Sequence, residues 1–100
     1  MESAENDIFK KAKQILQDIQ GEYFKEKNID KKIVFEEYRL LRGGDTVHPT
    51  WVVCVNEPVF GVSQFLEISD ITNEPLIWRT SMVSAFEIKK DTNGKYFIKK

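Results

Sequence analysis

The first quarter of the chain has the hydrophobic pattern of an amphipathic helix. Its apolar residues recur at steps of four, three, one, three and four, which places them on one face of a helix with about 3.6 residues per turn. Phe9 and Phe24 widen this face, and Ser3 or Asn6 is suited to the N-cap. We predict a helix over 6–27, weakened near its end by Gly21. Its apolar face comprises Ile8, Ala12, Ile15, Leu16, Ile19 and Tyr23.

The remainder of the chain consists of short apolar runs separated by turn residues, which is the pattern of a sheet. Because the turns are short, an antiparallel meander is the simplest topology, and the helix must bury its apolar face against it. A bulge near Glu36 and Glu37 would reconcile the alternation in the first run. We therefore predict an α+β fold with one N-terminal amphipathic helix packed on an antiparallel meander sheet of about four to six strands. The runs are 32–42, 50–55, 59–70, 76–80, 84–89 and 96–98.

Length and composition indicate one domain, 1–100, in a reducing compartment. The chain has 100 residues, enough for one hydrophobic core, and 41% of them are hydrophobic. Cys54 is the only cysteine and cannot form an internal disulfide, whereas a secreted domain of this size usually contains several. The first residues lack the basic and apolar segments of a signal peptide, and no run has the length of a membrane span. We expect a cytoplasmic protein with no membrane association.

Charge is distributed unevenly along the chain. Residues 43–88 contain six acidic residues and one basic residue, a net charge of about −5 that favours a basic partner, although a solvated sheet face is the simpler explanation of such a run. The last twelve residues are rich in lysine and include Tyr96 and Phe97. A sequence pI near 5.8 argues against nucleic-acid binding, and lysines on a terminal strand also prevent unwanted strand pairing.

No set of residues forms a catalytic or metal-binding motif. His48 and Cys54 are the only candidates for a base and a nucleophile, and no glycine-rich elbow surrounds Cys54. The simplest expectation is that Cys54 is a small core residue and that His48 is exposed. A zinc site needs about four ligands from cysteine, histidine and carboxylate side chains, and one cysteine and one histidine do not suffice. The Gly43-Gly44 doublet lacks the following lysine of a phosphate-binding loop. We expect no enzyme activity, cofactor or metal.

Binding of another protein is the function class that remains. The acidic residues of the predicted sheet and its turns are candidates for contacts with a basic partner. Trp78, next to Arg79, is a candidate hot spot if it is exposed, whereas the alternative is that it closes one end of the core. We expect a monomer or a weak homodimer. The candidate partner-binding residues are Glu57, Glu67, Asp70, Glu74 and Trp78.

A leading helix followed by three segments resembles the small helix-plus-sheet immunity proteins of bacterial contact-dependent and polymorphic toxin systems. These segments are 51–55 (WVVCV), 65–70 (FLEISD) and 73–76 (NEPL). The resemblance covers residues 7–76 and consists of strand and turn patterns rather than signature residues. It implies a cytoplasmic inhibitor that binds a cognate toxin, and it transfers no functional residue.

The alternative function is a small-ligand or lipid-binding module with a pocket between helix and sheet. Such a pocket would be apolar and lined by Phe9, Leu16, Phe35 and Phe65, whereas an inhibitor would have a filled core.

Overall fold

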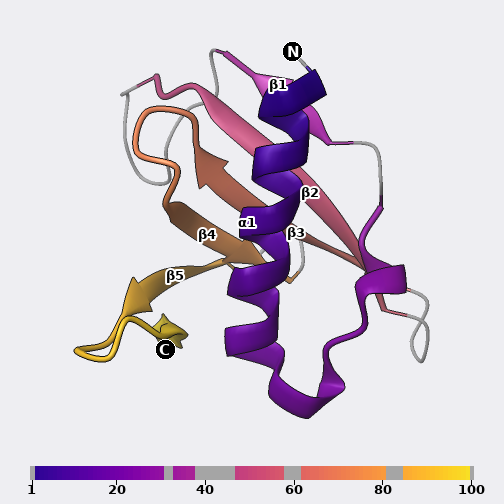
Figure 1. Ribbon diagram of the computed structural model, residues 1–100, viewed down its shortest axis with the longest axis vertical. Coiled ribbons are helices and arrows are strands. Elements are labelled where there is room, and N and C mark those ends of the chain that lie inside the picture. Colours follow the sequence, from indigo (N-terminus) through magenta and orange to yellow (C-terminus); the bar gives the residue numbers. More distant parts are fainter. Residues whose placement is uncertain (1, 31–32, 38–46, 58–61, 81–84, 100) are drawn as a thin grey trace.

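The fold is one helix lying across a six-stranded antiparallel sheet, as the sequence predicts (Figure 1). The computed structural model describes residues 2–30, 33–37, 47–57, 62–80 and 85–99. Each strand pairs antiparallel with the next, so the order in the sheet is the order in the chain. The elements are α1 (Glu2–Gln20), the 3-10 turns η1 (Gly21–Tyr23) and η2 (Glu26–Asn28), and the strands β1 (Val34–Glu36), β2 (Thr50–Glu57), β3 (Val62–Ser69), β4 (Pro75–Arg79), β5 (Ala85–Lys90) and β6 (Tyr96–Lys99).

The helix begins and ends earlier than the sequence pattern predicts. It starts at Glu2, so Ser3 and Asn6 lie inside it and neither is the N-cap. It ends before Gly21, whose φ of +59° is in the left-handed region that glycine adopts at low cost. Tyr23, predicted on the apolar face, follows this break and is 78% exposed. The prediction of helix as far as residue 27 is therefore wrong, and η1 and η2 occupy that segment.

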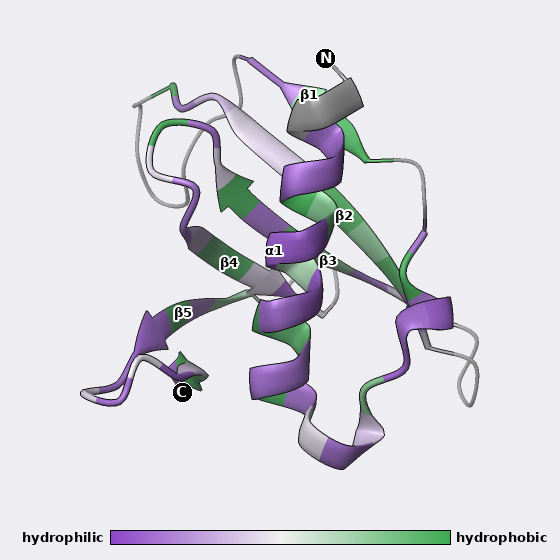
Figure 2. Ribbon diagram, viewed as in Figure 1, coloured by the Kyte–Doolittle hydropathy of each residue, from purple (hydrophilic) through white to green (hydrophobic). Residues whose placement is uncertain are grey.

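The core lies between α1 and one face of the sheet. In Figures 1 and 2 the helix crosses in front of the strands, and its hydrophilic residues are turned toward the viewer. The sheet curls into a half-barrel. Phe9, Ile19, Phe24, Trp51, Phe86 and Ile98 pack against the rim of the core. The buried core residues are Ile8, Ala12, Ile15, Leu16, Ile29, Ile33, Val53, Val55, Leu66, Ile68, Trp78, Ile88 and Tyr96.

Strand pairing decides which side chains face the helix. Residues that pair across neighbouring strands share a face, and successive residues alternate. Val53 pairs with Leu66 and Leu66 with Trp78, so all three face α1. Cys54 pairs with Phe65, so both point to the opposite face. Cys54 is consequently half-buried and outside the core, which corrects the prediction of a buried core cysteine.

The first predicted strand is described only in part. Strand β1 covers Val34–Glu36, Glu37 is in a turn, and residues 38–42 lie outside the described residues. The bulge predicted near Glu36 and Glu37 adjoins that gap. A register shift that the structure does describe lies between Glu67 and Ile68, where Ile68 pairs with Pro75 and Leu76 is the extra residue of β4.

A side chain from the last turns of α1 attaches the helix to the far edge of the sheet. The Tyr96 amide donates a hydrogen bond of 3.1 Å to the Asp18 carboxylate. Strand β6 pairs only with β5, and an edge strand leaves amides unpaired. Asp18 therefore satisfies an edge amide of β6 and fixes the helix over the sheet.

The face opposite α1 contains a buried ion pair that generates a stability prediction. Glu67 is 3% exposed, and the Arg79 Nε lies 3.3 Å from its Oε2 atom. Arg79→Met leaves the buried carboxylate without this cation, so we expect a loss of about 2 kcal/mol in the free energy of unfolding. Urea denaturation measures this free energy. The double variant Glu67→Gln/Arg79→Met is expected to be more stable than Arg79→Met alone, and equal stability of Arg79→Met and the wild type would contradict the prediction.

Candidate functional site

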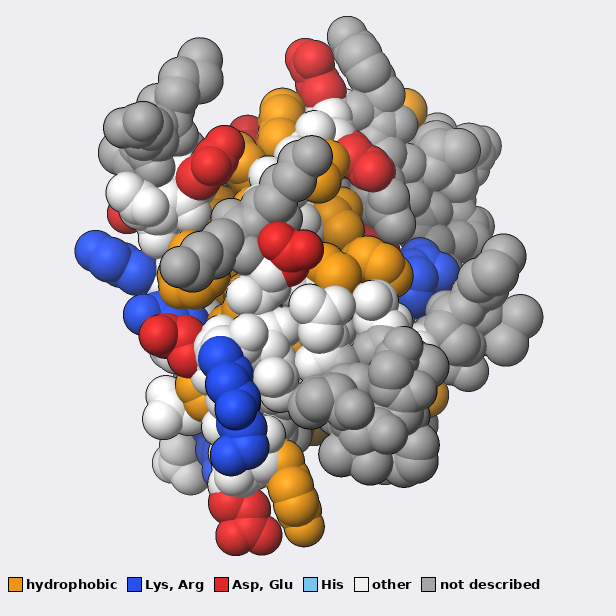
Figure 3. Space-filling view, turned by 90° about the vertical axis from the view of Figure 1, so that its right-hand side faces the viewer, with side chains coloured by type: hydrophobic (Ala, Val, Ile, Leu, Met, Phe, Trp, Pro, Cys, Tyr) orange, Lys and Arg blue, Asp and Glu red, His pale blue; other side chains and the backbone are white. Residues whose placement is uncertain are grey.

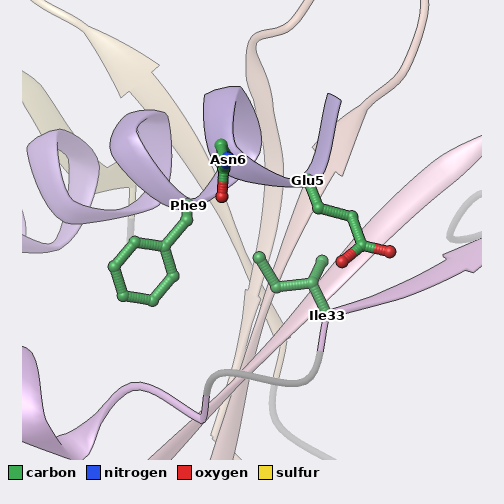
Figure 4. A pocket seen from close by; sticks show the side chains of 4 residues that line it. All are labelled: Glu5, Asn6, Phe9 and Ile33. Atoms are coloured by element: carbon green, nitrogen blue, oxygen red, sulfur yellow. The ribbon is translucent and has the colours of Figure 1, made fainter. Parts of the chain in front are cut away.

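A small pocket opens between the N-terminal half of α1 and the segment that leads into β1. It is lined by Glu5, Asn6, Phe9 and Ile33, and its volume is about 230 Å³ (Figure 4). In Figure 4, Ile33 faces the helix, with the Phe9 ring on one side of it and the Glu5 carboxylate on the other. We call these four residues the α1 pocket.

Helical spacing brings three of these residues together. Residues three and four positions apart share a face of an α-helix, so Glu5 and Asn6 lie one turn before Phe9. Phe9 packs against the edge of the core, and Ile33 is buried in it. The Phe9 ring also lies 5.4 Å from the Lys13 ammonium, which itself pairs with Glu26 at 3.0 Å. The base of the α1 pocket is therefore apolar and continuous with the core.

The rim of the α1 pocket is polar and lacks internal partners. Glu5 and Asn6 are exposed, and neither side chain hydrogen-bonds or pairs with another of the described residues. An apolar base with a carboxylate and an amide at its mouth suits a group that combines an apolar stem with a positive head.

A second apolar surface continues from the α1 pocket across β1, the start of β2 and the turn after β3. Phe35 lies two residues after Ile33, on the same side of the chain as in a strand, and its ring is 4.8 Å from that of Trp51. The Trp51 Nε1 donates a hydrogen bond of 2.7 Å to the Asp70 carboxylate. Ile71 follows Asp70 in the turn and is 68% exposed. We call Phe35, Trp51, Asp70 and Ile71 the end surface.

Apolar and acidic side chains are mixed on the side of the molecule that carries the chain from η2 to β1. In Figure 3, which turns this side toward the viewer, red acidic side chains surround exposed orange apolar ones in the upper half of the face. Lysine and arginine side chains lie to the left, to the right and below this area in the same view.

Two of the predicted partner-binding residues are buried. Glu67 pairs with Arg79 on the face opposite the helix, and Trp78 is 4% exposed in the core beneath α1. Of the two alternatives for Trp78, the structure shows the core position, because its pairing with Leu66 turns it toward the helix, and it is not an exposed hot spot. The side chain of Glu57 lies outside the described residues. Of the five, Asp70 and Glu74 are at least partly accessible, and a partner contact by either stays a prediction.

Glu74 is the centre of a charged cluster that joins α1 to strands β5 and β6. Its Oε2 accepts a hydrogen bond of 2.7 Å from the Tyr96 hydroxyl, and its Oε1 lies 3.2 Å from the Lys90 ammonium and 3.8 Å from that of Lys11. Both ammonium groups also lie over the Tyr96 ring, at 5.0 and 5.2 Å from its centre. Every member already has a partner, so the cluster is better suited to fixing the helix than to binding.

The pKa shifts of this cluster follow from its contacts. Burial by itself raises the pKa of Glu74, but the hydrogen bonds from Tyr96 and Lys90 and the charge of Lys11 outweigh it, so the pKa lies below the usual range. Burial and the hydrogen bond to Glu74 raise the pKa of the Tyr96 phenol.

His48 forms a contact that the sequence does not predict. It is partly buried rather than exposed, and its Nε2 lies 2.6 Å from the Ser69 hydroxyl. Such a pair resembles a base and a nucleophile. However, Ser69 is fully buried, and its oxygen also accepts hydrogen bonds from the amides of Ile71 and Thr72. Ser69 therefore closes the turn after β3, where a substrate cannot reach it.

Neither a metal site nor a membrane-spanning helix is found within the described ranges. No group of three or more histidine, cysteine, aspartate or glutamate side chains there is arranged to hold a metal ion. Helix α1 is too polar to cross a bilayer.

The four side chains expected to line a ligand pocket do not surround one cavity. Phe9 lines the α1 pocket, but Leu16 is fully buried in the core. Phe35 lies on the exposed end surface, and Phe65 points to the opposite face of the sheet.

Comparisons with known proteins provide no family assignment for the chain. No family model, curated protein or solved structure matches it. The function must therefore be inferred from the two surfaces described above.

A pH-dependent stability follows from the depressed pKa of Glu74. The ionised carboxylate stabilises the fold above the unfolded-state pKa of about 4.3, and this contribution disappears as the pH falls through the lower folded-state pKa. Glu74→Gln is expected to lose less than about 1 kcal/mol at pH 7, because the carboxylate is partly exposed.

Urea denaturation at pH 7, 5 and 3 checks this expectation. The stability difference between the wild type and Glu74→Gln should shrink between pH 5 and pH 3. Glu22→Gln, a substitution of an exposed carboxylate on η1, is the control and should show no comparable trend. A difference for Glu74→Gln that stays constant over the whole range would refute the role of the cluster.

Proposed function

We propose that this protein binds another protein through the end surface and the adjoining α1 pocket. The observation that carries the proposal is the group of apolar side chains on the end surface, where the exposed Phe35 packs on the half-buried Trp51. Trp51 in turn donates a hydrogen bond to Asp70, and the exposed Ile71 follows Asp70 in the turn. Exposed apolar side chains scattered singly are ordinary, whereas adjoining ones with a polar rim are typical of interfaces.

The composition of the end surface supports this function. Tryptophan is enriched among residues that dominate binding energy, and Trp51 is held in place by Phe35 on one side and by Asp70 on the other. A side chain that is fixed before binding loses little conformational freedom in the complex. The end surface therefore has a preorganised anchor in Trp51.

The net negative charge of residues 43–88 favours a basic partner. Together with the resemblance to immunity proteins of bacterial toxin systems, this supports a more specific proposal. We propose that the protein is a cytoplasmic inhibitor that binds a basic toxin domain and blocks it.

Two phenylalanines of similar exposure provide a matched pair of variants. Phe35 on the end surface is 42% exposed, and Phe97 on β6, at the opposite edge of the sheet, is 44% exposed. Phe35→Ser is expected to weaken partner binding by at least about tenfold, because it removes an apolar contact and the support of Trp51. Phe97→Ser should change the affinity by less than about twofold.

The experiment starts with a pull-down from the native host and continues with the purified partner. Isothermal titration calorimetry then compares the wild type, Phe35→Ser and Phe97→Ser, with thermal unfolding as the check on folding. Asp70→Lys should also weaken binding, and the loss of affinity should be larger at low salt than at high salt. Equal effects of the two phenylalanine variants, or a partner that is acidic and binds Asp70→Lys more tightly, would exclude the proposed surface.

A further inference from the structure

The chemistry of the α1 pocket indicates which group of a partner it receives. We propose that the α1 pocket binds one arginine side chain of the partner protein, with the stem against Phe9 and Ile33 and the guanidinium at Glu5. This inference rests on the proposed protein-binding function and specifies a contact within it.

The size of the α1 pocket suits a side chain rather than a free ligand. Sites for drug-sized molecules occupy roughly 300–1,000 Å³. The α1 pocket holds about 230 Å³ and is open to solvent at the Glu5 and Asn6 rim. A single long side chain entering from a partner surface fills such a space, with its backbone remaining outside.

The walls of the α1 pocket fit the two parts of an arginine. Phe9 and Ile33 offer an apolar surface for the methylene stem. Glu5 offers two carboxylate oxygens, and the Asn6 carbonyl oxygen is a further acceptor. Arginine presents several donors in a fixed plane and matches a carboxylate in a bidentate way, which lysine cannot do.

The electrostatics at the rim favour a cation. The Glu5 carboxylate has no ion-pair partner within the described part of the chain, so an incoming cation displaces no contact among these residues. The nearest cation recorded at the Phe9 ring is Lys13, whose charge is compensated by Glu26 at 3.0 Å. Asp7, one residue beyond Asn6 on the same helix and also exposed, adds negative charge near the rim.

The test uses short peptide probes and needs no partner. The probes are an N-acetylated, C-amidated arginine peptide flanked by glycines and the same peptide with citrulline, which has the shape of arginine without its charge. Two-dimensional NMR of the isotope-labelled full chain is expected to show shifts at Phe9 and Ile33 with the arginine peptide. The citrulline peptide should bind at least about threefold more weakly, and the difference should shrink in high salt.

Matched variants assign the contact to Glu5. Glu5→Gln should reduce the affinity for the arginine peptide to the level measured for the citrulline peptide. Asp7→Asn should retain most of the affinity for the arginine peptide. Both positions are exposed on α1, so neither change threatens the fold. Equal binding of the two peptides, shifts located away from the α1 pocket, or equal effects of the two variants would overturn the arginine assignment.

The outcome separates this inference from the proposed function. If the arginine peptide does not bind but Phe35→Ser still weakens binding of the purified partner, only the arginine assignment fails. If the peptide binds at the α1 pocket but Phe35→Ser and Phe97→Ser behave alike, the end surface fails and the α1 pocket stands.

Discussion

The burial of one helix stripe against one face of the sheet is the contact on which the rest of the structure depends. Ile8, Ala12, Ile15 and Leu16 supply the helix side of this contact, and the sheet has no second helix to cover it within the described residues. Burying a large aliphatic side chain stabilises a fold by about 1.5–3 kcal/mol, so this one layer contributes much of the stability available to a chain of this length. The position of α1 therefore decides which sheet residues are hidden and which remain accessible.

Polar contacts at the edge of the sheet fix the helix within this layer. The Asp18 carboxylate accepts from the Tyr96 amide, and Lys11 approaches Glu74, which also binds the Tyr96 hydroxyl. Apolar packing alone is non-directional and would allow the helix to slide or rotate over the strands. Contacts of defined geometry at two points along α1 oppose such motion. They act around β6, whereas the α1 pocket and the end surface lie toward β1.

The sequence predicts the fold well because the two periodicities that matter are local. A stripe at helical spacing and apolar runs between turn residues are both visible in short windows, and the single meander order follows from short connections. Element ends are less predictable. Gly21 stops α1 through its backbone conformation, and Tyr23 loses its place in the stripe for that reason alone.

The candidate site is harder to predict because it depends on strand register. Trp78 and Ile77 are adjacent, and nothing within 76–79 indicates which of them faces the helix. The pairing of Trp78 with Leu66 decides which residue faces the helix. A shift of one residue in this register would move every side chain of the strand to the other face of the sheet. The α1 pocket has the same difficulty. Glu5, Asn6 and Phe9 share a helix face by spacing, but only the tertiary fold brings Ile33 against them.

The distribution of satisfied polar groups separates structural residues from functional ones. Glu67, Glu74, Ser69 and Asp18 each have partners inside the fold, and three of these side chains fix turns or the helix. A carboxylate with internal partners must give them up to bind something else, which costs free energy. Glu5 has no such contact among the described residues and lies beside apolar surface that the core leaves partly open. A partner is therefore bound at lowest cost where the fold has left both a charge and an apolar wall unused.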